Sequence, residues 1–196
     1  DLVKVIKLDP VLMAKVLKLI NSTYFGMPRE ITSISRAVLL LGVNTIKNLA
    51  LSTAVVSTVA DEDDNPFDLH EVWEHALGVA VAAKLIAKRR GVKLKDLEEY
   101  FIAGLLHDIG QILLISYVPK VYAKVVKASD DDFTVLNDEE RKVFGCDHAQ
   151  LGALVAEKWK LTPNLIAAIR DHHEPENFVD HPHADFILTT AAANYF

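Results

Sequence analysis

Residues 103–110, with the sequence AGLLHDIG, set a histidine and an aspartate side by side within an otherwise apolar stretch. Burying His107 and Asp108 costs free energy unless each side chain finds a partner. Neutral imidazole and carboxylate together bind divalent metals such as iron, manganese or zinc. Further histidines stand at positions compatible with helices, and they complete a set of six possible ligands: His75, His107, Asp108, His148, His172 and His173.

Packed helices must bring these side chains together. His75 lies early in a long expected helix, whereas His107 and Asp108 lie near the end of a later one, so packing those two helices would join three ligands. Helical metalloproteins use such inward-facing sets from several helices. We therefore expect one pocket that can bind a metal, with these ligands: His75, His107, Asp108, His148 and His172. A metal-free hydrogen-bond network is the alternative interpretation.

The N-terminal part, residues 1–60, is predicted to be a small helical lobe of three helices. Asp9 followed by Pro10 is typical of a helix start, Ser33 can cap a second helix that Gly42 ends, and Asn44 can cap a third. Residues 61–66 are acidic, lack apolar side chains and end in proline, which predicts a linker or exposed loop.

The remaining residues, 67–196, are predicted to form a larger helical lobe that holds the histidines. Apolar residues recur there at helical spacing, with few alternating β-branched runs, so the expected fold class is all-α. The expected helices cover 67–90, 96–116, 119–128, 134–144, 148–160, 163–173 and 184–196.

Composition narrows the function classes. The chain has 196 residues, is 51% hydrophobic and carries a formal net charge of −6, which argues against nonspecific binding to nucleic acid or anionic membrane. The single cysteine rules out an internal disulfide and fits a reducing compartment. Apolar stretches are interrupted before the roughly 18 residues of a membrane span, and no signal peptide opens the chain. We expect a cytoplasmic protein.

The chain resembles the HD superfamily of helical metal-dependent phosphohydrolases, and in particular the HDOD (HD-related output) domain of bacterial signalling proteins. The resemblance spans nearly the whole chain and implies an HD-like helical bundle with a small N-terminal helical lobe. Its motifs are DPVL (9–12), LINSTYFG (19–26), ISRAV (34–38), LG (41–42), WEH (73–75), GLLHDIG (104–110), HAQLG (148–152) and WKLTP (159–163).

The resemblance also implies roles for individual residues. His75, His107 and Asp108 take the positions of metal ligands in catalytic HD proteins, and His148 and His172 those of a second metal site in the HD-GYP branch. Three departures accompany this match. Gln111 replaces the usual lysine of HD-GYP enzymes, no Gly-Tyr-Pro signature follows residues 172–174, and Asn194 replaces a late aspartate ligand.

Three functions follow as hypotheses. The departures favour a noncatalytic signalling output or protein-interaction module, with signalling proteins as partners. The surviving ligands permit a metal-dependent phosphohydrolase, in which a metal at His75, His107 and Asp108 assists the attack of water on a phosphoester. The short N-terminal helices around Gly42 superficially resemble a helix-turn-helix, but without a dense basic face nucleic-acid binding is disfavoured.

Overall fold

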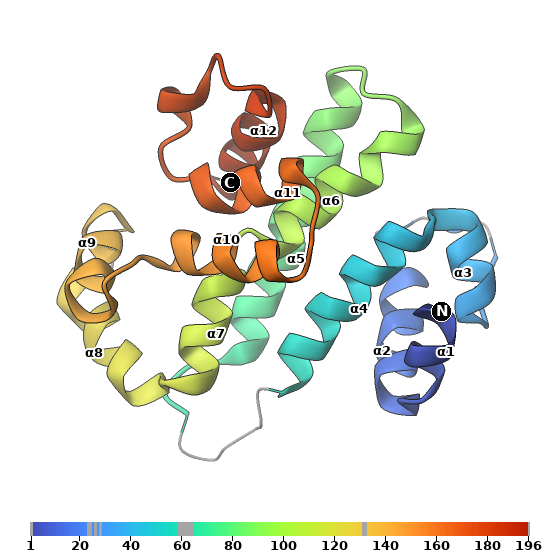
Figure 1. Ribbon diagram of the computed structural model, residues 1–196, viewed down its shortest axis with the longest axis horizontal. Coiled ribbons are helices and arrows are strands. Elements are labelled where there is room, and N and C mark those ends of the chain that lie inside the picture. The colour runs from blue at the N-terminus through green and yellow to red at the C-terminus, as the bar shows by residue number, and fades with distance from the viewer. Residues whose placement is uncertain are drawn as a thin grey trace. The chain divides into compact units, whose positions relative to one another are not determined.

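The computed structural model describes residues 2–22, 25, 27, 29–58, 65–130 and 133–195, and every regular element among them is a helix (Figure 1). The predicted all-α fold class is therefore confirmed. The chain divides into two compact units, Asp1–Thr58 and Val59–Phe196. Most of the linker predicted at 61–66 lies outside the described residues, so that assignment stays a prediction.

The described residues of unit 1 form four helices: α1 (Leu2–Lys7), α2 (Pro10–Ile20), α3 (Ile34–Leu41) and α4 (Val43–Thr58). Three helices were expected, and α1 is the additional one. The Asp9 carboxylate accepts hydrogen bonds from the first turn of α2, and Gly42 ends α3 with a positive φ of 85°. The predicted cap at Asn44 is wrong, because α4 begins one residue earlier, at Val43.

Unit 2 contains the remaining elements, which agree closely with the expected ranges except in one place. They are α5 (Leu69–Arg89), η1 (Leu94–Asp96), α6 (Leu97–Leu106), α7 (Ile109–Tyr117), α8 (Pro119–Ser129), α9 (Phe133–Phe144), α10 (His148–Lys158), α11 (Pro163–Asp171), η2 (Pro175–Phe178) and α12 (Ala184–Asn194). Helix α6 packs against α5, α11 and α12, whereas α7 packs against α8 and α10.

The exception is the single helix expected at 96–116, which is broken at His107 and Asp108. Asp108 has a non-helical backbone, with φ −101° and ψ 24°, and α7 begins directly after it. A continuous helix would point adjacent side chains about 100° apart. The break instead directs both side chains to one place.

The two glycines of the 104–110 motif are required by close packing. A Cβ at Gly104 would lie 2.7 Å from the Ala80 Cα of α5, so α6 could not approach α5 as closely with any larger residue. A Cβ at Gly110 would lie 1.9 Å from the His148 carbonyl oxygen of α10. The motif thus sets the distances between the helices that carry the histidines.

Among the described residues, one stretch has the length and hydropathy that a membrane crossing requires, Leu97–Tyr117, which is α6 and α7 together. This stretch is longer than the apolar segments expected from the sequence. Its most apolar window is 78% buried inside the fold, as in the core helix of a globular domain. Burial within unit 2 accounts for its composition.

Candidate metal centre

The six candidate ligands converge in unit 2 around Asp108. They form two groups that share this carboxylate, and within each group the ligand atoms lie within 4.8 Å of one another. We call Asp108 with His148, His172 and His173 the buried half, and Asp108 with His75 and His107 the open half. The structure brings together all five predicted ligands, and it adds His173.

The buried half lies on the Oδ1 side of Asp108. The Nε2 atoms of His148 and His172 lie 3.5 and 3.3 Å from Oδ1. The Nε2 atoms of His148 and His173 are 2.7 Å apart. The histidines of this half thus come from the start of α10 and from the residues directly after α11.

The open half lies on the Oδ2 side of the same carboxylate. His107 Nε2 is 2.9 Å from Oδ2, and His75 Nε2 is 3.8 Å from it. The His107 side chain is fully buried, whereas 48% of the His75 side chain is exposed. In this half, His75 is therefore the ligand that is in contact with solvent.

Hydrogen bonds at Nδ1 orient three of the histidines, whose Nε2 atoms face Asp108. The Nδ1 atoms of His107 and His172 donate to the backbone carbonyls of Gly104 and Ile169, at 2.8 and 2.9 Å. His148 Nδ1 donates to Glu140 Oε2 at 2.7 Å. Metal-binding histidines are held in this way, with Nδ1–H engaged and Nε2 directed at the metal. The arrangement thus presents Nε2 atoms to Asp108.

Two buried atoms in the cluster have no hydrogen-bond partner, and this observation tests whether the residues fit a metal. They are Asp108 Oδ1 and His172 Nε2, and they lie 3.3 Å apart. Because His172 donates through Nδ1, its Nε2 is an acceptor, so two acceptors face each other. Unsatisfied buried polar atoms of this kind are costly. A divalent cation bound between these two atoms would satisfy both, so the residues fit a divalent metal.

Protonation of the cluster follows from its charges. Burial alone would lower the pKa of His148, but Asp108 and Glu140 outweigh burial and raise this pKa to about 10. Asp108 likewise overcomes burial at His107 and raises its pKa, whereas burial and neighbouring histidines lower the pKa of His173 to about 3. Because the pKa values of His107 and His148 are both raised, metal binding competes with protons in both halves.

Glu140 is a site residue that the sequence analysis missed. Its fully buried carboxylate accepts hydrogen bonds from the backbone N–H and Nδ1–H of His148 and from the Tyr122 hydroxyl, each at 2.7 Å. In the sequence it follows two exposed-looking acidic residues. A usable signal was its spacing of four residues from both Leu136 and Phe144, which places it on the apolar face of α9.

The residues that depart from the HD pattern also lie at this site. Asn194, at the end of α12, places Oδ1 3.1 Å from His107 Nε2, so a neutral amide borders the open half. The Gln111 side chain interacts with the Tyr122 hydroxyl. Gln111 is thus engaged with the support of the buried half.

Comparison with known proteins agrees with this geometry. The family model of the HDOD domain matches residues 1–175. A Shewanella amazonensis structure whose name proposes a phosphohydrolase is 34% identical, with a TM-score of 0.74, over 98% of this chain and 66% of its own. The response regulator MmoQ of Methylococcus capsulatus is 25% identical, with a TM-score of 0.62, over 99% of this chain and 75% of its own.

The chain corresponds to only part of longer relatives. An uncharacterised protein of Treponema pallidum is 30% identical to it over an alignment of 198 positions, which covers 99% of this chain and 37% of the relative. The chain therefore spans about a third of that protein's length.

Proposed function

The chain belongs to the HDOD domain family, and from this premise we propose that it is a noncatalytic signal-transduction output domain whose histidine cluster binds a divalent metal. Signalling proteins as partners, and a cytoplasmic location, are parts of the same proposal. MmoQ, a relative of similar fold, is named as a response regulator, which supports a signalling role.

The observation that carries the noncatalytic part is Asn194 beside the open half. Its amide oxygen lies 3.1 Å from His107 Nε2, where a carboxylate would add a negative charge. With Asn194, Asp108 is the one anion among the side chains grouped at that half. Charge compensation of a dication is correspondingly weaker. Loss of one such interaction at an active site commonly costs roughly a hundredfold in rate.

The second supporting observation is Gln111, which has no positive charge to offer a phosphate. Its side chain interacts instead with the Tyr122 hydroxyl, which hydrogen-bonds Glu140 behind His148. Both departures weaken phosphate chemistry, and neither removes an imidazole that could bind a metal.

Metal binding gives such a domain a means of regulation. Asp108, His148, His172 and His173 would hold the ion in the buried half, joining α10 and α11 to the break between α6 and α7. A bound divalent cation would supply positive charge that balances Asp108 and engages the lone pair of His172. A ligand present at 100 times its dissociation constant stabilises the folded state by about 2.7 kcal/mol. Metal availability would thus change the stability of this helical junction.

Elemental analysis of protein purified without chelator, followed by incubation with cyclic di-GMP, tests both parts of the proposal. We expect bound iron, manganese or zinc that is absent from the Asp108→Asn variant, and we expect cyclic di-GMP to remain intact. Metal-free protein would contradict the binding part. Turnover that disappears in His107→Ala would contradict the noncatalytic part.

The second candidate function is a metal-dependent phosphohydrolase. The exposed His75 side chain favours it, because a substrate could reach the open half from that side. The name of the Shewanella relative points in the same direction. A screen of phosphomonoesters and phosphodiesters with manganese added back would support this candidate if turnover depended on both His75 and His107.

A further inference from the structure

A buried hydrogen-bond network supports the metal centre from behind. It starts at Gln111 on α7, whose side chain interacts with the Tyr122 hydroxyl on α8. The Tyr122 hydroxyl donates to Glu140 on α9, and Glu140 accepts both N–H groups of His148. Tyr122 and Glu140 are both fully buried. Side chains from α7, α8 and α9 therefore orient the imidazole of His148.

Each atom in this network has a defined role. Glu140 Oε2 accepts the Nδ1 proton of His148, which makes Nδ1 the donor and directs Nε2 toward Asp108. Glu140 Oε1 is occupied by Tyr122, so the carboxylate cannot turn away from His148 without losing a buried hydrogen bond. A carboxylate on the far nitrogen of a metal-binding histidine also raises the basicity of that ligand.

The network reaches the surface through Phe67. The ring centroids of Phe67 and Tyr122 lie 5.5 Å apart, and the Phe67 backbone N–H donates to Asn65 Oδ1 at 3.1 Å. Phe67 stands nine residues after the end of α4, so it lies where the chain enters the described part of unit 2. The network thus links the metal centre to this point of entry.

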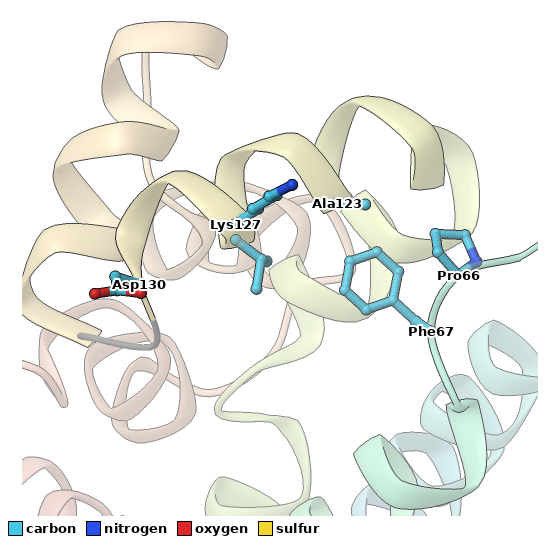
Figure 2. Close-up of a pocket in the computed structure, with 6 residues that line it drawn as sticks. Pro66, Phe67, Ala123, Lys127 and Asp130 are labelled. Carbon is cyan, nitrogen blue, oxygen red and sulfur yellow. The ribbon is translucent and has the colours of Figure 1, made fainter.

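Phe67 also lines a pocket on the surface of unit 2. Figure 2 shows Pro66 and the Phe67 ring facing Ala123 and Lys127 of α8, and the pocket encloses about 370 Å³. Val126 and Asp130 complete the lining. Displacement of Phe67 at this pocket would act directly on the ring that carries the Tyr122 hydroxyl.

We propose that Glu140 and Tyr122 are positioning residues that hold His148 as a metal ligand, and that Phe67 connects them to the surface pocket at the start of unit 2. The expected effect on metal affinity rests on the proposed function. The expected effect on His148 does not depend on a metal: loosening Tyr122 or Phe67 changes the Nδ1 hydrogen bond of His148.

The experiment combines two measurements on metal-stripped protein. Proton NMR follows the downfield Nδ1–H signal of His148, and titration with Mn²⁺ alone gives the dissociation constant. We expect Glu140→Gln to move or abolish the signal and to weaken Mn²⁺ binding about 10- to 100-fold. Tyr122→Phe, which keeps the ring, should shift the signal and weaken binding by roughly fivefold. Phe67→Leu should produce a smaller shift in the same direction.

Tyr117→Phe is the matched control, because Tyr117 is 72% exposed and lies outside the network. An unchanged His148 signal in Tyr122→Phe would overturn the inference. An unchanged signal in Phe67→Leu would overturn the connection to the pocket. If wild-type protein binds no Mn²⁺ while Tyr122→Phe still shifts the signal, the proposed function fails and the positioning inference stands.

Discussion

The two halves of the histidine cluster share one carboxylate but differ in everything around it. In the buried half, Glu140 backs His148, and an unpartnered His172 Nε2 faces Asp108 Oδ1. In the open half, 48% of the His75 side chain is exposed, and a neutral amide, Asn194, borders His107. The same residue types therefore stand in two different environments.

This difference follows from desolvation and charge. In the buried half, excluded water and a supporting carboxylate strengthen the interaction with a cation. In the open half, solvent competes and Asn194 adds no charge. We expect the buried half to fill first as metal is added, and the predictions below test that order.

Asp108→Asn should have the largest effect, because both halves lose their shared anion. We expect metal binding to weaken by about 1000-fold or more, as isothermal titration with Mn²⁺ would measure. Asp138→Asn, on an exposed side chain of α9, is the control and should bind as the wild type does. Retained binding in Asp108→Asn would remove the basis of the comparison.

Substituting one histidine from each half should separate the two sites. His172→Ala removes the unpartnered ligand of the buried half and should weaken the tighter binding event by roughly 100-fold. His75→Ala should affect only the weaker event, since His75 groups with His107 and Asp108 and not with His148. Equal effects of the two variants on the tighter event would contradict the proposed order.

Gly110→Ala should damage the buried half through packing. The new methyl group would overlap the His148 carbonyl, so we expect a loss of about 1–3 kcal/mol in the free energy of unfolding and weaker binding at the tighter site. Gly78→Ala in α5 is the matched control, because a Cβ there meets no atom within 4 Å. Chemical denaturation measures both. A Gly110→Ala protein as stable as Gly78→Ala would show that α7 and α10 separate at little cost.

The raised pKa of His148 predicts that metal binding in the buried half depends on pH. Because the pKa of folded His148 is raised to about 10, the proton stabilises the metal-free fold fully below about pH 6.5, and this contribution is lost as pH rises toward 10. Metal must displace that proton, so affinity should rise by about tenfold per pH unit between pH 6 and 8. Titrations in buffers of different ionisation enthalpy would count the released protons, and a pH-independent affinity would contradict the assignment.

Asn194→Asp should have the smallest effect, a modest increase in the metal affinity of the open half. The added carboxylate beside His107 should strengthen the weaker binding event by several-fold. Asn44→Asp, on an exposed residue of unit 1, serves as the charge control. If Asn194→Asp also gained cyclic di-GMP hydrolysis, the neutral amide would be the reason for the proposed lack of turnover.

Much of the fold was predictable because its signals are local. Asp9 before Pro10 and Ser33 before α3 cap their helices as expected, and the helical spacing of apolar residues located the elements of unit 2. The predicted helix boundaries were wrong where contacts with other helices determine them. No proline marks the break at His107 and Asp108 in the sequence. The break is instead accompanied by close packing of Gly104 and Gly110 against other helices, which the sequence does not show.

The sequence singled out the candidate ligands but not their arrangement. By itself, the sequence determined the six candidate ligands and the glycines beside them, because motif spacing along helices is a property of neighbouring residues. Only the tertiary structure decided that Asp108 divides the histidines between its two oxygens and that Glu140 lies buried behind His148. These facts depend on contacts between helices distant in the chain, and such contacts arise from packing and desolvation, which local periodicity does not encode.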